Sequence, residues 1–190
     1  MKITNIQTYP IYHGHRNYTF IKIDTDKEIY GIGEFGLTWK EQAGIGAIEH
    51  MKNHLIGLDP LNIEWIWQLL FRGDFFPGGR INTAAMSAID IALWDIKGKV
   101  KGKSIHSLLG EEQKRVRAYV AGGYYAKNKG LKELQEELLH NVENLNATAI
   151  KIKIGDPNVG ISEDMKRIEA ARILGLGRNT ITRKIKELDL

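Results

Sequence analysis

Two lysines separated by one residue stand at the end of an apolar run. Lys151 and Lys153 lie in the segment 149–154, and the loop residues 155–157 follow at once. Side chains alternate along a strand, so we expect both ammonium groups on the same face. Their repulsion favours the loss of one proton, and a neutral lysine can accept a proton from a substrate. The spacing alone is also typical of a solvated strand edge, so the surrounding elements must decide.

The segments around the lysines predict a parallel crossover. Residues 116–120 have a strand pattern, 131–144 the pattern of an amphipathic helix, and 149–154 a second strand. Strand, helix, strand is the unit from which parallel sheets are built. Parallel architectures place their chemistry at the carboxyl ends of the strands, and that is where Lys151 and Lys153 fall.

The residues before the crossover predict a different, α+β arrangement. Alternating apolar residues indicate a three-stranded antiparallel meander, followed by helices. We expect Asn82 or Thr83 to cap the most apolar helix, and Trp65, Trp67 and Trp94 to serve core or interdomain packing. The expected elements are strands over 2–12, 18–24 and 28–35, a helix over 40–55, a second helix with Leu61, Trp65, Ile66, Leu69 and Leu70 inward, a shaped loop over 72–80, a helix over 82–98 and a helical turn near 104–109.

Composition excludes several classes of protein. The 190 residues are 43% hydrophobic and 26% charged, which is typical of a globular chain, and they include no cysteine. Disulfides, thiolate metal sites and cysteine redox chemistry are therefore excluded. No apolar run approaches the roughly 20 residues of a membrane span, and we expect a cytoplasmic protein without a membrane partner. A closed eightfold barrel needs about 250 residues, so the chain is too short for one.

Several segments together resemble the mandelate racemase and muconate lactonizing enzyme group of the enolase superfamily, in particular its galactonate and mannonate dehydratases. The resemblance covers roughly residues 1–170. The segments that carry it are Met1–Tyr12, Gly31-Ile32-Gly33-Glu34, the helix from Ala88-Ile89-Asp90 to Lys99, Leu108-Leu109-Gly110, and Ala149-Ile150-Lys151-Ile152-Lys153-Ile154-Gly155.

The resemblance implies a fold and a chemistry. An N-terminal capping domain would close over a modified β/α barrel. Lys153 would take the proton α to a carboxylate of an acid sugar, with Lys151 tuning it, and water would then be lost. Mg²⁺ would stabilise the enediolate. The substrate contacts implied for the capping loops are His13, His15, Tyr18, Phe76 and Arg80.

The chain departs from the family beyond residue 170, where the strands that would carry the Mg²⁺ ligands are not recognisable. We therefore expect a truncated barrel whose metal ligands are absent, and a polypeptide that is inactive as an isolated chain; whether it is an enzyme is left open. The predicted division is a capping domain over 1–114, the start of a barrel over 115–164, and a basic helical pair over 165–190. Open strand edges predict homo-oligomers.

The basic tail suggests a second function. Residues 165–190 contain seven basic and three acidic residues, a net charge of +4, whereas residues 1–164 are neutral. The spacing of Ala171, Gly175 and Ile181 resembles the helix-turn-helix of NtrC-type activators and Fis. The alternatives are a basic helix pair docked on the remaining chain, or DNA binding through Arg178, Asn179, Thr182, Arg183, Lys184 and Lys186.

Two further patterns resemble ligand sites, but we do not interpret them as such. His50 and His54 have a helical spacing that suits zinc, but no third ligand accompanies them, so we expect surface histidines. Gly31 and Gly33 superficially resemble a nucleotide-binding loop, but they open no helix and have no third glycine in register.

Overall fold

The computed structural model describes residues 1–14, 16–73, 75–76, 78–110 and 116–173. The chain divides into two units, Met1–Glu112 and Gln113–Leu190. Within the described residues, no helix combines the length and apolar character that a membrane span would require.

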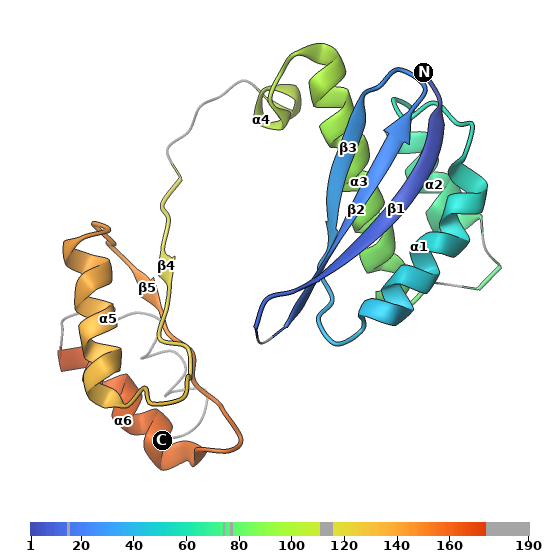
Figure 1. The fold of residues 1–190 in the computed structure, drawn as a ribbon. Coiled ribbons are helices and arrows are strands. Elements are labelled where there is room, and N and C mark those ends of the chain that lie inside the picture. The colour runs from blue at the N-terminus through green and yellow to red at the C-terminus, as the bar shows by residue number, and fades with distance from the viewer. Residues whose placement is uncertain (15, 74, 77, 111–115, 174–190) are drawn as a thin grey trace. The chain divides into compact units, whose positions relative to one another are not determined.

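The first unit is a three-stranded antiparallel sheet with helices on one face (Figure 1). The predicted α+β meander is confirmed, with β2 in the centre and paired to both neighbours. The elements are β1 (Ile3–Tyr12), β2 (Asn17–Thr25), β3 (Tyr30–Phe35), α1 (Glu41–Leu55), α2 (Ile63–Arg72), α3 (Arg80–Lys101) and α4 (Ile105–Leu109).

The core of this unit lies between the sheet and α3. Alternation along β2 turns Ile21 and Ile23 inward, and both are fully buried. The residues of α3 that face them recur at helical spacing and are buried as well, among them Ile89, Leu93 and Ile96. The two periodicities therefore meet in one apolar layer.

Helix α3 approaches strand β3 unusually closely. A Cβ on Gly31 would lie 2.0 Å from the Ala92 carbonyl oxygen, and one on Gly33 would lie 2.0 Å from that of Ala88. The glycines thus leave room for the helix backbone, which is the reason for their alternation. At the edge of β3, Asp95 of α3 accepts the Ile32 N–H at 2.9 Å. Lys99 donates to the Tyr30 carbonyl at 2.7 Å and pairs with Asp95.

Two details of the helical prediction are wrong. Helix α3 begins at Arg80, so Asn82 and Thr83 lie in its first turn, and Gly79 occupies the N-cap position instead. The Thr83 hydroxyl donates back to the Gly79 carbonyl at 3.2 Å. Trp65 is predicted on the inner face of its helix but is 53% exposed, and Trp67 is 40% exposed, because α2 turns Ile63 and Ile66 to the core. Neither tryptophan is therefore a core residue of this unit, and their alternative role in interdomain packing stays a prediction.

The second unit is a strand–helix–strand crossover followed by a helix. Strands β4 (Val120–Ala121) and β5 (Ile150–Lys151) are parallel, as predicted, with α5 (Leu131–Glu143) between them in sequence and α6 (Gly160–Ile173) after them. Its small core consists of Leu134, Leu138 and Ala171, with Ile150 and Ile152 packed against it.

Both strands are shorter than predicted. Only two residues in each pair as strand, and Val116 is 85% exposed. Apolar alternation predicts a strand, but regular structure also requires a partner for each backbone group. The predicted division at residue 165 falls inside α6, which is continuous from Gly160 to Ile173.

Candidate functional site

The two lysines lie at the carboxyl end of β5. Lys151 is the last residue of the strand, and both it and Lys153 are exposed, with the half-buried Ile152 between them. The parallel pairing extends past the strand. The Gly122 N–H donates to the Lys151 carbonyl at 2.9 Å, and the Lys153 N–H is 3.4 Å from the Gly123 carbonyl. The Lys151 ammonium group lies 5.8 Å from the centroid of the Tyr119 ring.

Gly123 links the two strand ends and is held from both sides. Its φ of +63° is in the left-handed region, and a Cβ there would lie 3.0 Å from Ile152 and 3.1 Å from Leu134. The Glu137 carboxylate accepts the Gly123 N–H at 3.0 Å and also pairs with Lys129. Burial alone would raise the pKa of Glu137, but the hydrogen bonds from Lys129 and Gly123 outweigh it and lower that pKa.

Sequence reasoning missed the residues that fix this region. Arg167 was counted with the basic tail, but it is only 2% exposed, and its guanidinium donates to the Gly123 carbonyl. Tyr125 and Asp164 form a hydrogen bond beneath the same loops. The available signal was the pair Asp164 and Arg167, three residues apart on the helix that follows the lysine strand.

The structure places two of the predicted capping residues together at the turn between β1 and β2. The rings of His13 and Tyr18 are 5.9 Å apart, edge to face, and the Tyr18 ring stacks on Phe20 at 6.5 Å. The Arg16 guanidinium lies 4.4 Å from the Tyr18 ring centroid and donates to its hydroxyl. His15 lies outside the described residues. The turn therefore presents an aromatic and cationic surface of the kind that holds carboxylates and hydroxyls.

The other two capping residues lie between α2 and α3. Phe76 is 72% exposed and meets Phe75 edge to face at 5.3 Å, and Arg80 is the exposed first residue of α3. Gly78 of this loop lines a groove of about 340 Å³.

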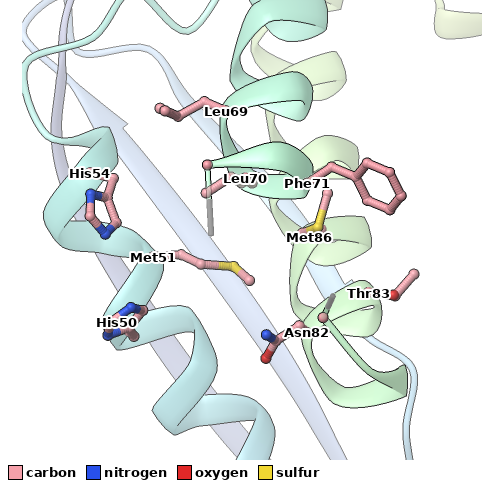
Figure 2. A pocket seen from close by; sticks show the side chains of 11 residues that line it. His50, Met51, His54, Leu69, Leu70, Phe71, Asn82, Thr83 and Met86 are labelled. Carbon is pink, nitrogen blue, oxygen red and sulfur yellow. The ribbon is translucent and has the colours of Figure 1, made fainter. Parts of the chain in front are cut away.

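That groove lies among α1, α2 and α3, and Figure 2 shows side chains from all three helices turned toward it. His50 and His54 of α1 are exposed, with ring centroids 5.7 Å apart, and they share the groove with Met51, Met86 and Asn82. Among the residues that the structure describes, no three His, Cys, Asp or Glu side chains gather as metal ligands, either here or elsewhere.

Two features thus define the class of protein. A meander with α3 packed on it makes a capping-type α+β unit, and a parallel crossover carrying two lysines at its strand end follows it. The family model "Mandelate racemase / muconate lactonizing enzyme, N-terminal domain" matches residues 6–110, more than half of the chain. The chain belongs to this family of the enolase superfamily.

Relatives of known name carry the similarity into the second unit. A D-galactonate dehydratase from Pectobacterium atrosepticum is 34% identical over 175 residues, which are 90% of this chain and 43% of that protein. The chain spans about two fifths of the length of the curated relatives that it matches.

Solved structures agree with this assignment. A member of the enolase superfamily from Salmonella Typhimurium has a TM-score of 0.77 and 30% identity, over 90% of this chain and 51% of that one. An enolase from Pantoea ananatis with bound D-gluconate and Mg has a TM-score of 0.68 and 31% identity, over 80% of this chain and 36% of that one.

A second family model, of Fis-family bacterial regulatory proteins, matches residues 166–188. The six residues predicted to bind DNA, from Arg178 to Lys186, lie outside the described residues. Ala171, predicted as the small residue at a helix crossing, is 3% exposed and packs on Leu134 and Leu138 of α5.

Proposed function

We propose that this chain supplies the capping domain and the proton-abstracting lysine of an acid-sugar dehydratase. The proposal depends on one observation: a chain of this family has two exposed lysines, Lys151 and Lys153, at the carboxyl end of a parallel strand. A related D-galactonate dehydratase and a relative with bound D-gluconate support an aldonic acid as the substrate class.

The proposed step balances with one base and one leaving group. The neutral amine of Lys153 takes the proton from the carbon next to the substrate carboxylate, and the electron pair of that C–H bond moves toward the carboxylate. The neighbouring C–O bond then breaks, and the hydroxyl takes up a proton and leaves as water. The enol that results takes up a proton at the carbon that lost the hydroxyl and releases the proton of its remaining hydroxyl, which gives a 2-keto-3-deoxy acid.

Magnesium is implied by the family, but the described residues do not fit it, because no three acidic or imidazole side chains converge among them. The proposal therefore contains no step through the metal. His13, His15, Tyr18, Phe76 and Arg80 are proposed as substrate contacts of the capping unit.

A chimera tests the role of Lys153. Residues 1–173 of this chain replace the matching segment of the Pectobacterium D-galactonate dehydratase, and the 2-keto-3-deoxy product is measured with D-galactonate and Mg²⁺. We expect activity that Lys153→Ala lowers by at least about 10³-fold. Lys132→Ala is the control, because Lys132 is an exposed residue of α5 in the same unit. A folded, active chimera that is indifferent to Lys153→Ala would contradict the proposal.

We further propose that the isolated 190-residue polypeptide does not dehydrate aldonic acids. The measurement is ¹H NMR of D-galactonate and D-gluconate in D₂O with Mg²⁺, which detects both exchange of the α-proton and loss of water. Turnover by the purified polypeptide alone would contradict this proposal.

DNA binding is the second candidate function, favoured by the regulatory-protein match over residues 166–188. Phosphate contacts make affinity fall steeply with salt, so a mobility shift at 50 and 200 mM salt is informative. The chain without residues 174–190 is measured beside the full chain, because this truncation removes the predicted DNA contacts and spares the buried Ala171. If neither salt concentration gives a shift that depends on these residues, only the first function remains.

A further inference from the structure

A buried arginine lies behind the lysine strand end. Arg167 of α6 is 2% exposed, and its Nε has no hydrogen-bond partner among the described atoms. Burial of a guanidinium group is unfavourable unless its contacts compensate. Its Nη2 donates to the Gly123 carbonyl, and its guanidinium carbon lies 4.2 Å from the centroid of the Tyr125 ring.

The Gly123 carbonyl, which accepts from Arg167, also lies opposite the backbone N–H of Lys153. The Lys153 N–H is 3.4 Å from the Gly123 oxygen, so a single acceptor serves the arginine and the backbone of the proposed base. A carbonyl has two lone pairs and can accept both donors. The Gly123 N–H is fixed independently by Glu137 at 3.0 Å, which leaves this peptide little freedom to rotate.

A second set of contacts holds the other end of the lysine segment. The Tyr125 hydroxyl donates to one oxygen of the Asp164 carboxylate, and the other oxygen accepts the Gly155 N–H at 2.8 Å. The Asp156 N–H lies 3.5 Å from the Tyr125 hydroxyl oxygen. Burial and the bond to Asp164 raise the pKa of Tyr125, which therefore stays a hydrogen-bond donor at neutral pH.

We propose that Arg167, together with Tyr125 and Asp164, is a positioning residue that fixes the backbone of Lys153 for proton abstraction. The guanidinium holds the Gly123 carbonyl, which also accepts the Lys153 N–H. The Tyr125–Asp164 pair holds Gly155, two residues after Lys153 in the chain. The catalytic part of this inference rests on the proposed function. The positional part does not, because it concerns the chain alone.

Amide hydrogen exchange in the full 190-residue chain tests the positional part. Arg167→Lys keeps the charge but loses the planar stacking and the fixed donor fork. We expect it to speed exchange at the Lys153 N–H by about tenfold, with less than about twofold change at Leu138 in α5. Arg172→Lys is the matched control on the same helix, because Arg172 is exposed and pairs with Glu169, three residues before it. It should leave both amides unchanged.

Tyr125→Phe gives an independent reading, because it removes the hydroxyl and keeps the ring under Arg167. We expect faster exchange at the Gly155 N–H, again without change at Leu138. Equal acceleration at all amides of the unit, unfolding of the unit by both variants, or unchanged exchange at Lys153 and Gly155 would each overturn the positioning role.

The chimera then separates this inference from the proposed function. In it, Arg167→Lys should lower kcat by at least about tenfold with KM changed less than about twofold, as expected for a misplaced base. Arg172→Lys should change neither. If the chimera is active but its kcat is insensitive to Arg167→Lys, the positioning role in catalysis fails while the proposed function stands. If Lys153→Ala has no effect, the proposed function fails, and the exchange data alone decide the positional claim.

Discussion

The two units of the chain are stabilised in different ways. The first buries seventeen apolar residues in one cluster between its sheet and helices. In the second, the cluster formed by the described residues has three members, and the unit also encloses Arg167 and Asn141. Apolar burial is roughly additive and tolerant of exchange, whereas a buried polar network depends on each partner. The unit with the proposed base is therefore the one whose geometry depends on individual hydrogen bonds.

The comparison also predicts that the second unit unfolds first, because it has much less apolar area to bury. Two probes report on the two units separately. All four tryptophans lie in the first unit, so their fluorescence reports on it alone. Amide signals of α5 and α6 report on the second unit.

The largest effect is expected where α3 touches β3. Gly33→Val places a side chain against the Ala88 carbonyl oxygen, which lies only 2.0 Å from the Cβ position, so helix and strand must separate. We expect a loss of more than about 3 kcal/mol in the free energy of unfolding of the first unit, measured by tryptophan fluorescence in urea.

Gly46→Ala is the matched control for this substitution, because Gly46 lies in α1 with no atom within 4 Å of its Cβ position. Alanine should stabilise the helix there by about 0.5–1 kcal/mol. A similar loss of stability in both variants would show that the close approach of α3 is not what the glycine of β3 permits.

The next largest effect tests the small core. Leu138→Ala removes one of the two leucines that are fully buried among the described residues of the second unit, and we expect a loss of about 2–4 kcal/mol there. The measurement is denaturant-dependent loss of α5 amide signals, with tryptophan fluorescence recorded in the same samples. A parallel shift of the fluorescence midpoint would contradict the separation into two units.

A smaller effect concerns the edge of β3. Asp95→Ala removes the acceptor of the Ile32 N–H and the partner of Lys99. We expect a loss of about 1 kcal/mol in the first unit, by urea titration. Glu49→Ala is the control. The Glu49–Lys52 pair on α1 is 4.0 Å long and should contribute only about 0.3 kcal/mol to the free energy of unfolding. Equal effects would mean that Asp95 acts only through its ion pair.

The smallest effect is a pH dependence at Asp90 of α3. Burial raises the pKa of its carboxyl above the ordinary value of 3.8. The folded state therefore binds the proton more tightly than the unfolded state, and stability falls as the pH rises through the two pKa values. Asp90→Asn should stabilise the first unit at pH 7 by no more than about 0.5 kcal/mol, and its effect should disappear below about pH 3. Urea titrations at both pH values measure this, and a destabilised variant at pH 7 would contradict it.

Local pattern was sufficient for the elements of the first unit, apart from the start of α3, and for the place of the lysines. The alternation along β2 and the helical spacing in α3 depend on which residues prefer burial, so the meander and α3 were predictable. The predicted alternation at the lysine strand is also observed, because Lys151 and Lys153 are exposed and Ile152 between them is half-buried.

Pattern was misleading where a partner decides the outcome. The strand predicted from residue 116 is paired only from Val120 onward, because the first backbone hydrogen bond to the lysine segment joins the Val120 N–H to the Ala149 carbonyl. Trp65 is predicted on the inner face of its helix, but the rotation of α2 turns it outward. A single sequence does not specify which face of a largely apolar helix turns to the core.

The amino-acid order alone thus determined the periodicities, the motifs by which the chain resembles its family, and the pair of lysines at a strand end. Tertiary structure alone decided that the glycines of β3 lie against the backbone of α3, and that one arginine of a basic segment is buried beneath the Gly123 carbonyl. The physical reason is range: residue preferences act over a few positions, whereas Arg167 and Gly123 are 44 residues apart and meet only after the crossover has folded.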